Sequence, residues 1–344
     1  MKSLKIGNKN IGKNYKPFII CELGINHGGS LKVAKKMVDL AYRSGADAIK
    51  NQLHFPEHEM IDEAKKTIPS NTNKSIYKVI EENLMSLNDE KKLKLYVEKK
   101  NLIYLSTPFS LQAAKKLNEI GVKAFKIGSG EFNNLPLISE IIKFKKPLIL
   151  STGMNNLNSI KSTVELLDKK KVKYALLHCK SEYPADLKNL KLDFISILEK
   201  KFKKAVIGYS DHTIGVIPSI SAMAKGASII EKHFTDTKYR KGPDIICSMD
   251  PKELSILSKA SKEIFLSNGK DKKISKIEKI TAKFAFSSVV SIKKIRVGEK
   301  FNLKNLWVKR PGTGDFLANK LNFLIGKKAK KNISKNQFIK KEHV

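Results

Sequence analysis

Eight short apolar runs, separated by helix-like segments, constrain the fold of this chain more than any other feature. The runs cover residues 18–24, 48–53, 103–109, 124–130, 147–153, 174–180, 205–211 and 228–235. Between them, apolar residues recur three and four positions apart, and a Gly often stands near the end of the segment. Strands that alternate with helices build a parallel sheet from βαβ units. We therefore expect eight parallel strands.

Eight such units that close on themselves predict an α/β fold of the (β/α)8 barrel type. The alternative is an open doubly wound sheet, which more often carries a Gly-rich turn after its first strand. Here the first run is followed by NHGGS, at residues 26–30, which lacks the G-x-G-x-x-G spacing. The barrel is therefore the favoured interpretation.

A single barrel takes about 250 residues, so this chain of 344 residues has room for a second, smaller domain. We expect the barrel over residues 1–267, a Lys-rich linker over 268–283 and a small β-rich domain over 284–344, where short turn-rich pieces replace the βα pattern. Residues 54–75 are polar and exceed an ordinary βα loop, which indicates a functional flap.

The formal net charge of +34 raises the hypothesis of a basic nucleic-acid-binding protein. Only four of the 67 basic residues are Arg, however, and the Lys residues are spread over every helical segment, which indicates solvated faces rather than a recognition surface. No apolar run is long enough to cross a bilayer, and the N-terminus lacks the apolar core of a secretory signal. We expect a cytoplasmic protein with no membrane partner.

Polar side chains end all eight runs, where the working groups of α/β barrels project. They are Glu22, Lys50, Gln52, Ser106, Thr107, Lys126, Ser129, Ser151, Thr152, His178, Ser181, Ser210, His212, Glu231 and His233. Polarity at one strand end is common, but polarity at all eight predicts a pocket built for a polar substrate.

Strand parity brings two of these residues together. Alternate residues of a strand face the same side, so His212 and His233, at the ends of the seventh and eighth runs, are expected to converge. Two imidazoles with open positions suit a divalent ion such as Mn²⁺, Mg²⁺ or Co²⁺ that must also bind water and substrate oxygens. The alternative is a pair of hydrogen-bonded core histidines. Three widely separated cysteines suggest neither a disulfide framework nor a zinc site.

Lys50 and Lys126 end the second and fourth runs and are accompanied by several hydroxyl groups. Together these groups match a phosphate plus a carboxylate, since Lys supplies charge and hydroxyls supply directional donors. A Schiff-base lysine is the alternative and remains open from sequence alone.

Several segments resemble those of the bacterial N-acetylneuraminate (sialic acid) synthase family along nearly the whole chain. They are ICELGINHGGSLKVA, IPSNTNKSIY, LSTPFSLQAA, KIGSGEFNN, ILSTGMN, YALLHC, SDHT, EKHFTD, GPDIICSMDP, FAFSSVVS and LWVKRPGTGDF. KRPGTG resembles the antifreeze-like (SAF) domain that ends these enzymes. The resemblance implies a phosphoenolpyruvate-dependent transferase that condenses phosphoenolpyruvate with N-acetyl-D-mannosamine and water, giving N-acetylneuraminate and phosphate.

The resemblance also implies roles for individual residues. His212 and His233 would hold a Mn²⁺-like ion, and Glu22 would orient the sugar and handle protons. Phosphoenolpyruvate would be held by Lys50, Thr107, Lys126, Ser129, Ser151 and Ser210. The amino sugar would be contacted by Glu22, Gln52, Asn71, Tyr183 and Asp244, and by Arg310 from the SAF domain of the other subunit in a domain-swapped homodimer.

Some positions depart from the neuraminate pattern. CKSEYPAD places Glu182 beside Tyr183, and Tyr209 precedes SDHT, as in legionaminate synthases, whereas Leu53 replaces a commonly polar residue. These changes are expected near the sugar end of the site. N,N'-diacetyllegionaminate or pseudaminate synthesis is therefore the alternative reaction, although GPDIICSM is closer to neuraminate synthases.

Overall fold

The computed structural model describes residues 3–69, 71–269 and 271–344. The chain divides into two compact units, Met1–Asn268 and Gly269–Val344. Each unit is described by itself below.

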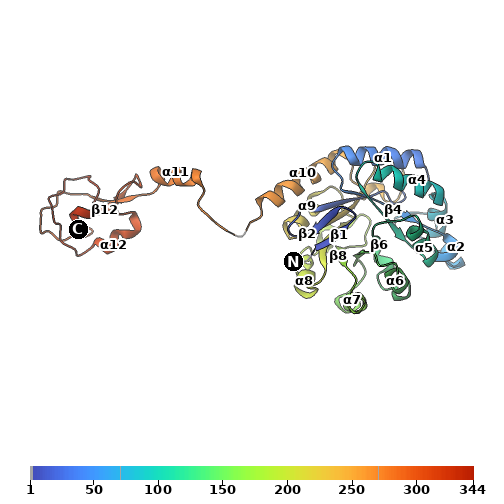
Figure 1. Ribbon diagram of the computed structural model, residues 1–344. Helices are drawn as coiled ribbons and strands as arrows, with labels where there is room; N and C mark the ends of the chain where they lie inside the picture. The colour runs from blue at the N-terminus through green and yellow to red at the C-terminus, as the bar shows by residue number, and fades with distance from the viewer. Residues whose placement is uncertain (1–2, 70, 270) are drawn as a thin grey trace. The chain divides into compact units, whose positions relative to one another are not determined.

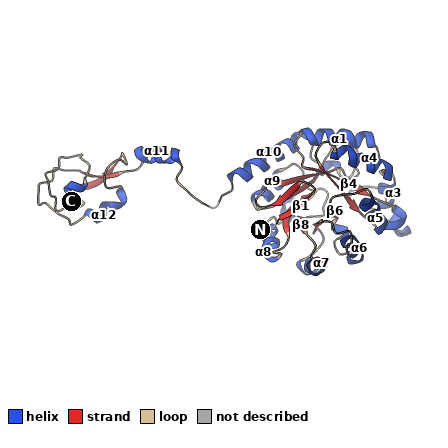
Figure 2. Ribbon diagram, in the orientation of Figure 1, coloured by secondary structure: helices blue, strands red, loops and turns tan. Residues whose placement is uncertain are grey.

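The first unit is built on eight parallel strands that lie within a ring of helices (Figures 1 and 2). Neighbouring strands follow the order β5-β4-β3-β10-β9-β8-β7-β6, and β5 lies next to β6, which closes the sheet. The strands are β3 (Phe18–Glu22), β4 (Ala48–Leu53), β5 (Ile103–Pro108), β6 (Phe125–Ile127), β7 (Leu148–Ser151), β8 (Tyr174–Cys179), β9 (Val206–Asp211) and β10 (Ile229–His233). The predicted (β/α)8 barrel is confirmed, and each strand lies within one of the eight predicted runs.

One helix of at least eight residues follows each strand before the next strand or the end of the unit. These are α1 (Leu31–Arg43), α4 (Leu87–Glu98), α5 (Leu111–Glu119), α6 (Leu135–Ile142), α7 (Leu157–Lys169), α8 (Phe194–Lys201), α9 (Ile217–Ala224) and α10 (Pro251–Ser267). Ser or Asn side chains cap the first turn of several of them, as Ser30 does for α1. At the start of α10, Asp250 and Glu253 form a capping box, and Pro251 is the first residue of the helix.

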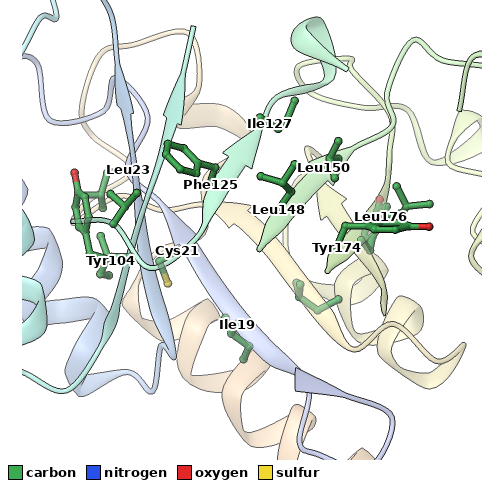
Figure 3. Packing of buried hydrophobic residues seen from close by; sticks show 14 of the residues in the cluster. Ile19, Cys21, Leu23, Tyr104, Phe125, Ile127, Leu148, Leu150, Tyr174 and Leu176 are labelled. Atoms are coloured by element: carbon green, nitrogen blue, oxygen red, sulfur yellow. The ribbon is translucent and has the colours of Figure 1, made fainter. Parts of the chain in front are cut away.

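The main hydrophobic core lies between the outer face of the barrel and the helices. Outward-facing strand residues such as Ile19, Phe125 and Leu150 are fully buried in this layer (Figure 3). Alternate residues of the same strands, such as Ile20 and Ile149, belong to a second cluster inside the barrel. Both faces of each strand are therefore apolar over most of its length, which is why the runs lack polar alternation.

An N-terminal hairpin contributes to this inner cluster. β1 (Ser3–Ile6) pairs antiparallel with β2 (Lys9–Gly12), and the buried Leu4, Ile6 and Ile11 pack with residues from the strands. The hairpin thus adds apolar packing to the barrel interior that the eight-run pattern does not show.

The long connection after β4 contains short helices. They are α2 (Pro56–Glu59), the 3-10 turn η1 (Asp62–Lys65) and α3 (Ile76–Glu81). Residue 70, inside the predicted flap, is outside the described residues. The described flap residues therefore have secondary structure of their own, which gives them fixed places around the cavity considered below.

The second unit is small and irregular. β11 (Ser288–Ser291) pairs antiparallel with β12 (Leu306–Lys309), α12 spans Leu321–Leu324, and buried residues including Val289, Phe301 and Ile333 form its core. Within the segment predicted as a linker, α11 (Lys276–Ala285) begins in the second half. A capping box of Ser275 and Glu278 starts this helix. None of the helices in the described residues is long and apolar enough to span a membrane.

Candidate active site

The predicted polar residues of the barrel meet at the carboxyl ends of the strands. Lys50, Thr107, Lys126, Ser151 and Ser210 are all buried. Ser129 opens a single 3-10 turn immediately after β6, where its hydroxyl accepts a hydrogen bond from the Gly153 N–H at 3.1 Å. Burying these polar groups destabilises the fold, because each of them must be desolvated. Their presence at the strand ends therefore indicates a function.

Two lysines and two carboxylates form the centre of this end of the barrel. Lys50 forms an ion pair with Glu22 and lies 4.0 Å from Glu231 Oε1, and Lys126 Nζ lies 3.3 Å from the same oxygen. Ser210 Oγ donates to Glu231 Oε1 at 3.2 Å. Glu231 therefore bridges the residues that were predicted to bind phosphoenolpyruvate.

Hydroxyl groups complete the surroundings of the two lysines. Lys126 Nζ donates to Ser151 Oγ at 2.8 Å, and Lys50 Nζ donates to Thr107 Oγ1 at 3.2 Å. Cationic and hydroxyl donors on adjacent strands thus converge on one region. This donor set can bind an anion such as a phosphate or a carboxylate.

The two central carboxyl groups differ electrostatically. Burial raises the pKa of Glu22 to about 7, and the negative charge of Glu231 adds to the rise, whereas Lys50 opposes it. For Glu231, burial acts in the same direction, but the charges of Lys126 and Lys50 hold its pKa below the ordinary value. Glu22 is thus the group suited to exchange a proton near neutral pH, and Glu231 is the permanent anion.

The two predicted histidine ligands lie together. The ring centroids of His212 and His233 are 5.6 Å apart, and the Tyr183 ring stacks on His212 with centroids 4.1 Å apart. His212 Nδ1 lies 2.8 Å from the carbonyl oxygen of Lys180, which can accept a hydrogen bond from the ring. This contact orients the imidazole and leaves the lone pair on Nε2.

His233 has the properties of a metal ligand. Its Nδ1 is buried and has no hydrogen-bond partner, although Asp244 Oδ2 lies 3.8 Å away. Burial, together with the charges of His212 and the nearby lysines, holds its pKa well below the usual range, so the ring is neutral. No set of three or more His, Cys, Asp or Glu side chains suited to a metal is found in residues 3–69, 71–269 and 271–344. The neighbouring rings of His212 and His233, with the unpartnered Nδ1 of His233, fit an ion that takes two imidazoles and completes its coordination with water and substrate oxygens.

A cavity of about 350 Å³ opens beside these residues, between the strand ends and the flap. Most of its wall is apolar, formed by Ile25, Met60, Ile76, Val79, Ile80, Phe109 and Pro243. Its polar groups include Gln52, His54, Asn71 and Asp244. A mostly apolar cavity with a few convergent polar groups is typical of a small-molecule site.

The residues predicted to contact the sugar are near this cavity. Gln52, Asn71 and Asp244 line the cavity. Gln52 Nε2 donates a hydrogen bond of 3.0 Å to Glu22 Oε1, which connects Glu22 to the cavity wall. Burial raises the pKa of Asp244 to about 6, against the opposing charges of His212 and Lys50. Arg310 is exposed on the second unit, so its predicted contact with the sugar stays a prediction.

Two polar residues of this end were not assigned a role from sequence. Glu231 appeared only as one of many polar strand ends, although it bridges Lys50 and Lys126. His54 hydrogen-bonds through Nε2 to Gln52 Oε1 at 3.1 Å. A parity argument would have found Glu231, because it shares a strand face with His233, whereas nothing in the local sequence distinguishes His54.

The predicted location of two departures from the neuraminate pattern is wrong. Tyr209 and Leu53 are buried in the outer core between the strands and the helices, on the opposite strand face from Ser210 and Gln52. Glu182 is partly exposed and contacts Lys180 and Asn189. These differences therefore do not distinguish one sugar from another through direct contact.

Comparison with known proteins identifies the family. Residues 37–273 match the NeuB family, and residues 286–344 match the SAF domain. A solved N-acetylneuraminic acid (sialic acid) synthetase from Leptospira borgpetersenii serovar Hardjo-bovis, crystallised with citrate, is 34% identical, with a TM-score of 0.75 over 81% of this chain and 95% of that chain.

Two curated relatives extend the similarity over nearly the full length. The N,N'-diacetyllegionaminic acid synthase of Campylobacter jejuni is 40% identical over 94% of this chain and 99% of its own length. The N-acetylneuraminate-9-phosphate synthase of Homo sapiens is 30% identical over 97% of this chain and 94% of its own. The resemblance seen in the sequence segments is thus confirmed: this chain belongs to the NeuB family of sialic acid-type synthases and carries a C-terminal SAF domain.

Proposed function

We propose that this protein condenses phosphoenolpyruvate with the open-chain aldehyde of an N-acetylated amino sugar to give a nine-carbon sialic-type acid and phosphate. The observation that carries the proposal is the convergence of the Lys50–Lys126 cluster, the Glu22 carboxyl and the His212–His233 pair at one end of the barrel. One group suits an anionic substrate, one a proton transfer and one a metal ion. The names of the relatives support the same class of reaction.

In this proposal, C3 of phosphoenolpyruvate forms a bond with the aldehyde carbon of the sugar. Water adds to C2, and phosphate then leaves with cleavage of its C–O bond. Lys126 and Lys50, with the hydroxyls of Ser151 and Thr107, hold the phosphate and carboxylate groups. Glu22 orients the sugar and exchanges a proton with it.

His212 and His233 are the proposed ligands of a divalent ion, of which Mn²⁺ is the first candidate and Mg²⁺ or Co²⁺ the alternatives. When bound, such an ion supplies Lewis-acid polarisation of a carbonyl oxygen. The Lys180 carbonyl orients His212, and the ring of Tyr183 packs on His212 and lies edge-on to His233, with centroids 6.0 Å apart.

For the sugar, we propose the 2,4-diacetamido-6-deoxy substrate of legionaminate synthesis. Relative to N-acetylmannosamine, this sugar replaces one hydroxyl by an acetamido group and loses another. Its additional methyl groups suit the apolar wall formed by Ile76, Val79, Phe109 and their neighbours. The 40% identity to the Campylobacter jejuni relative supports the same choice.

N-acetylmannosamine, the substrate predicted from the sequence, is the second candidate. The GPDIICSM segment favours it, and Asp244 of this segment lines the cavity. Asp244 supplies a carboxylate that can accept hydrogen bonds from sugar hydroxyls, which N-acetylmannosamine has in greater number.

The test is a panel of amino sugars incubated with purified protein, phosphoenolpyruvate and Mn²⁺, with phosphate release and product mass recorded. We expect kcat/KM for the diacetamido sugar to exceed that for N-acetylmannosamine by at least about tenfold, since two buried methyl groups contribute roughly 1.5 kcal/mol. A preference for N-acetylmannosamine would transfer the assignment to the second candidate. Lys126→Met should abolish phosphate release, whereas Lys143→Met, on the exposed surface of α6, should not.

A further inference from the structure

A hydrogen-bonded chain connects the Glu22 carboxyl to the flap. Gln52 Nε2 donates to Glu22 Oε1 at 3.0 Å, and Gln52 Oε1 lies 3.1 Å from His54 Nε2. His54 Nδ1 in turn lies 2.9 Å from Glu59 Oε1, on the short helix α2. Four polar side chains thus run in sequence from the strand ends to the first helix of the flap.

The His54 imidazole, the third member of this hydrogen-bonded series, is held on three sides. The side chains of His54 and Glu59 are 9% and 6% exposed, and the His54 ring stacks on Phe109 with centroids 4.2 Å apart and planes 13° apart. Both residues line the cavity. A ring fixed by an aromatic partner and a buried carboxylate has a single orientation, so it can fix the orientation of its neighbour.

The chemistry of the chain has a direction. Each ring nitrogen of His54 faces an oxygen, from Gln52 on one side and Glu59 on the other, so both contacts are hydrogen bonds when each nitrogen carries a hydrogen. The Gln52 amide has one donor end and one acceptor end. When His54 donates to the acceptor end, the donor end must face Glu22. Without His54, the amide is free to turn its oxygen toward that carboxyl group, where the two would repel.

We propose that His54 is a positioning residue that sets the orientation of the Gln52 amide and, through it, the place of the Glu22 carboxyl. This inference rests on the proposed function for its kinetic consequence, because Glu22 is there the group that orients the sugar. The hydrogen-bond chain itself does not depend on which sugar reacts. His54 also ties Glu22 to α2, so the first helix of the flap contributes to the geometry of the reacting end.

The principal variant is His54→Phe, which retains a ring against Phe109 and removes both donors. Displacing a positioned reacting group commonly costs about 100-fold, so we expect kcat to fall by that order while KM for phosphoenolpyruvate changes less than about twofold. The lysine cluster does not involve His54, which is why the two parameters should separate. Glu59→Gln keeps an acceptor for Nδ1 and should give a smaller loss.

Two controls separate positioning from structural damage. His58→Phe alters a half-exposed histidine on α2, next to Glu59, and should leave kcat unchanged. In a Gln52→Leu background the amide is gone, so His54→Phe should add less than about a twofold further loss. Full additivity of the two changes, an equal loss in His58→Phe, or a matching rise in KM for phosphoenolpyruvate would each overturn the proposal.

A measurement without substrate keeps this inference separate from the proposed function. Nitrogen-15 spectra of the histidine rings should show a hydrogen on Nε2 of His54, and the side-chain amide signal of Gln52 should shift in His54→Phe. If no sugar supports phosphate release but these spectra are as expected, the proposed reaction fails and the hydrogen-bond chain stands. A His54 ring with no hydrogen on Nε2, or a Gln52 amide that does not respond, would overturn the inference even in an active enzyme.

Discussion

Two buried charge clusters lie on opposite faces of the same strands, and they differ in how completely they are hydrogen-bonded. The outer cluster pairs Asp211 of β9 with Lys232 of β10, both fully buried, at 3.2 Å. Asp211 also accepts from Thr213 and Ser219, and Lys232 donates to the Thr213 carbonyl at 2.6 Å. None of these side-chain atoms lacks a partner.

The inner cluster also combines charged and hydroxyl side chains, but its hydrogen bonding is incomplete. It consists of Glu22, Lys50, Lys126, Ser210, Glu231 and His233. Glu231 Oε2 and His233 Nδ1 are buried without a hydrogen-bond partner, and so are Asn26 Oδ1 and Glu59 Oε2 near the same end of the barrel. An unpartnered buried polar atom destabilises the fold by about 1 to 3 kcal/mol. We infer that the outer cluster stabilises the fold, whereas the inner one keeps polar atoms free to bind substrate and metal.

The outer cluster also has a defined place relative to the inner one. Asp211 and Lys232 directly precede His212 and His233 in the sequence. Their ion pair connects the ends of β9 and β10, so it holds the two imidazoles at their mutual distance. Stability on one face of the strands thus supports geometry on the other.

The largest expected effect is that of His233→Ala in the inner cluster. We expect turnover to fall by at least about 10,000-fold, because the change removes one of two proposed protein ligands of the metal, which supplies several kcal/mol of transition-state stabilisation. The free energy of unfolding should change little, since His233 Nδ1 makes no hydrogen bond in the fold. Mn²⁺ titration by electron paramagnetic resonance, turnover and thermal unfolding measure the three quantities. Wild-type Mn²⁺ affinity in the variant would refute the ligand assignment.

Lys232→Met should show the opposite profile in the outer cluster. The variant leaves Asp211 buried without its cation, which typically costs about 3 to 5 kcal/mol of folding free energy. Urea unfolding measures this loss, and Lys225→Met, which breaks the exposed pair with Asp193, serves as the matched control with little expected effect. Stability equal to wild type would show that the outer cluster is not structural.

The sequence was sufficient to predict the barrel, and to predict which polar side chains meet at its strand ends, for a physical reason. Strands of a barrel are buried on both faces, so their apolar runs are short and uninterrupted, and polar residues can appear only at their ends. Parity then placed His212 beside His233 without any knowledge of the fold's details. These predictions depended on periodicities that persist whatever the neighbouring elements are.

Other features depended on long-range contacts that no local pattern encodes. Leu4 and Ile11 are isolated among basic and polar residues, yet they pack inside the barrel because the hairpin turns inward. The bridging role of Glu231 required the positions of two lysines on other strands. Tyr209 was expected near the sugar, but it faces the outer core because it alternates with Ser210.

The pH dependence of stability tests a third kind of buried group, His27, which is neutral and fully hydrogen-bonded. His27 Nδ1 accepts from the Gly29 N–H at 3.0 Å, and Nε2 lies 3.1 Å from Asn51 Oδ1. Burial lowers its pKa to about 4, despite the opposing contact with Asn51. A proton on Nδ1 would face the Gly29 N–H, so the folded protein resists protonation of this ring.

The sign of the pH dependence follows from that pKa. The unfolded chain takes up a proton at His27 near pH 6.5 and the folded chain only near pH 4, so stability is complete above pH 6.5 and is lost as the pH falls toward 4. The loss from this residue is about 3 kcal/mol. Urea unfolding of wild type and His27→Gln across this range isolates it, because other buried histidines are present in both proteins. Parallel pH profiles would contradict the expectation.

The smallest effect concerns an exposed charge, Arg310 on the second unit. Because it is exposed, Arg310→Ala should leave folding nearly unchanged. In the homodimer expected from the sequence it would have a function, however, since a partner's Arg310 would contact the N-acetyl group of the sugar. Ile277, Ile280 and Phe284 of α11 are also largely exposed, which provides an apolar face for such an assembly.

Mixing two differently impaired chains distinguishes a shared site from a self-contained one. Arg310→Ala should raise KM for the sugar roughly 5- to 150-fold, the effect of about 1 to 3 kcal/mol from a charged hydrogen bond, and should spare KM for phosphoenolpyruvate. Combined with a Glu22→Ala chain in a mixed dimer, it leaves one site with both residues intact if each barrel receives its arginine from the partner. If each chain instead uses its own Arg310, one site lacks Glu22 and the other lacks Arg310. Wild-type sugar affinity should therefore reappear in the mixture only when the site is shared, and its absence in confirmed heterodimers would refute the swapped arrangement.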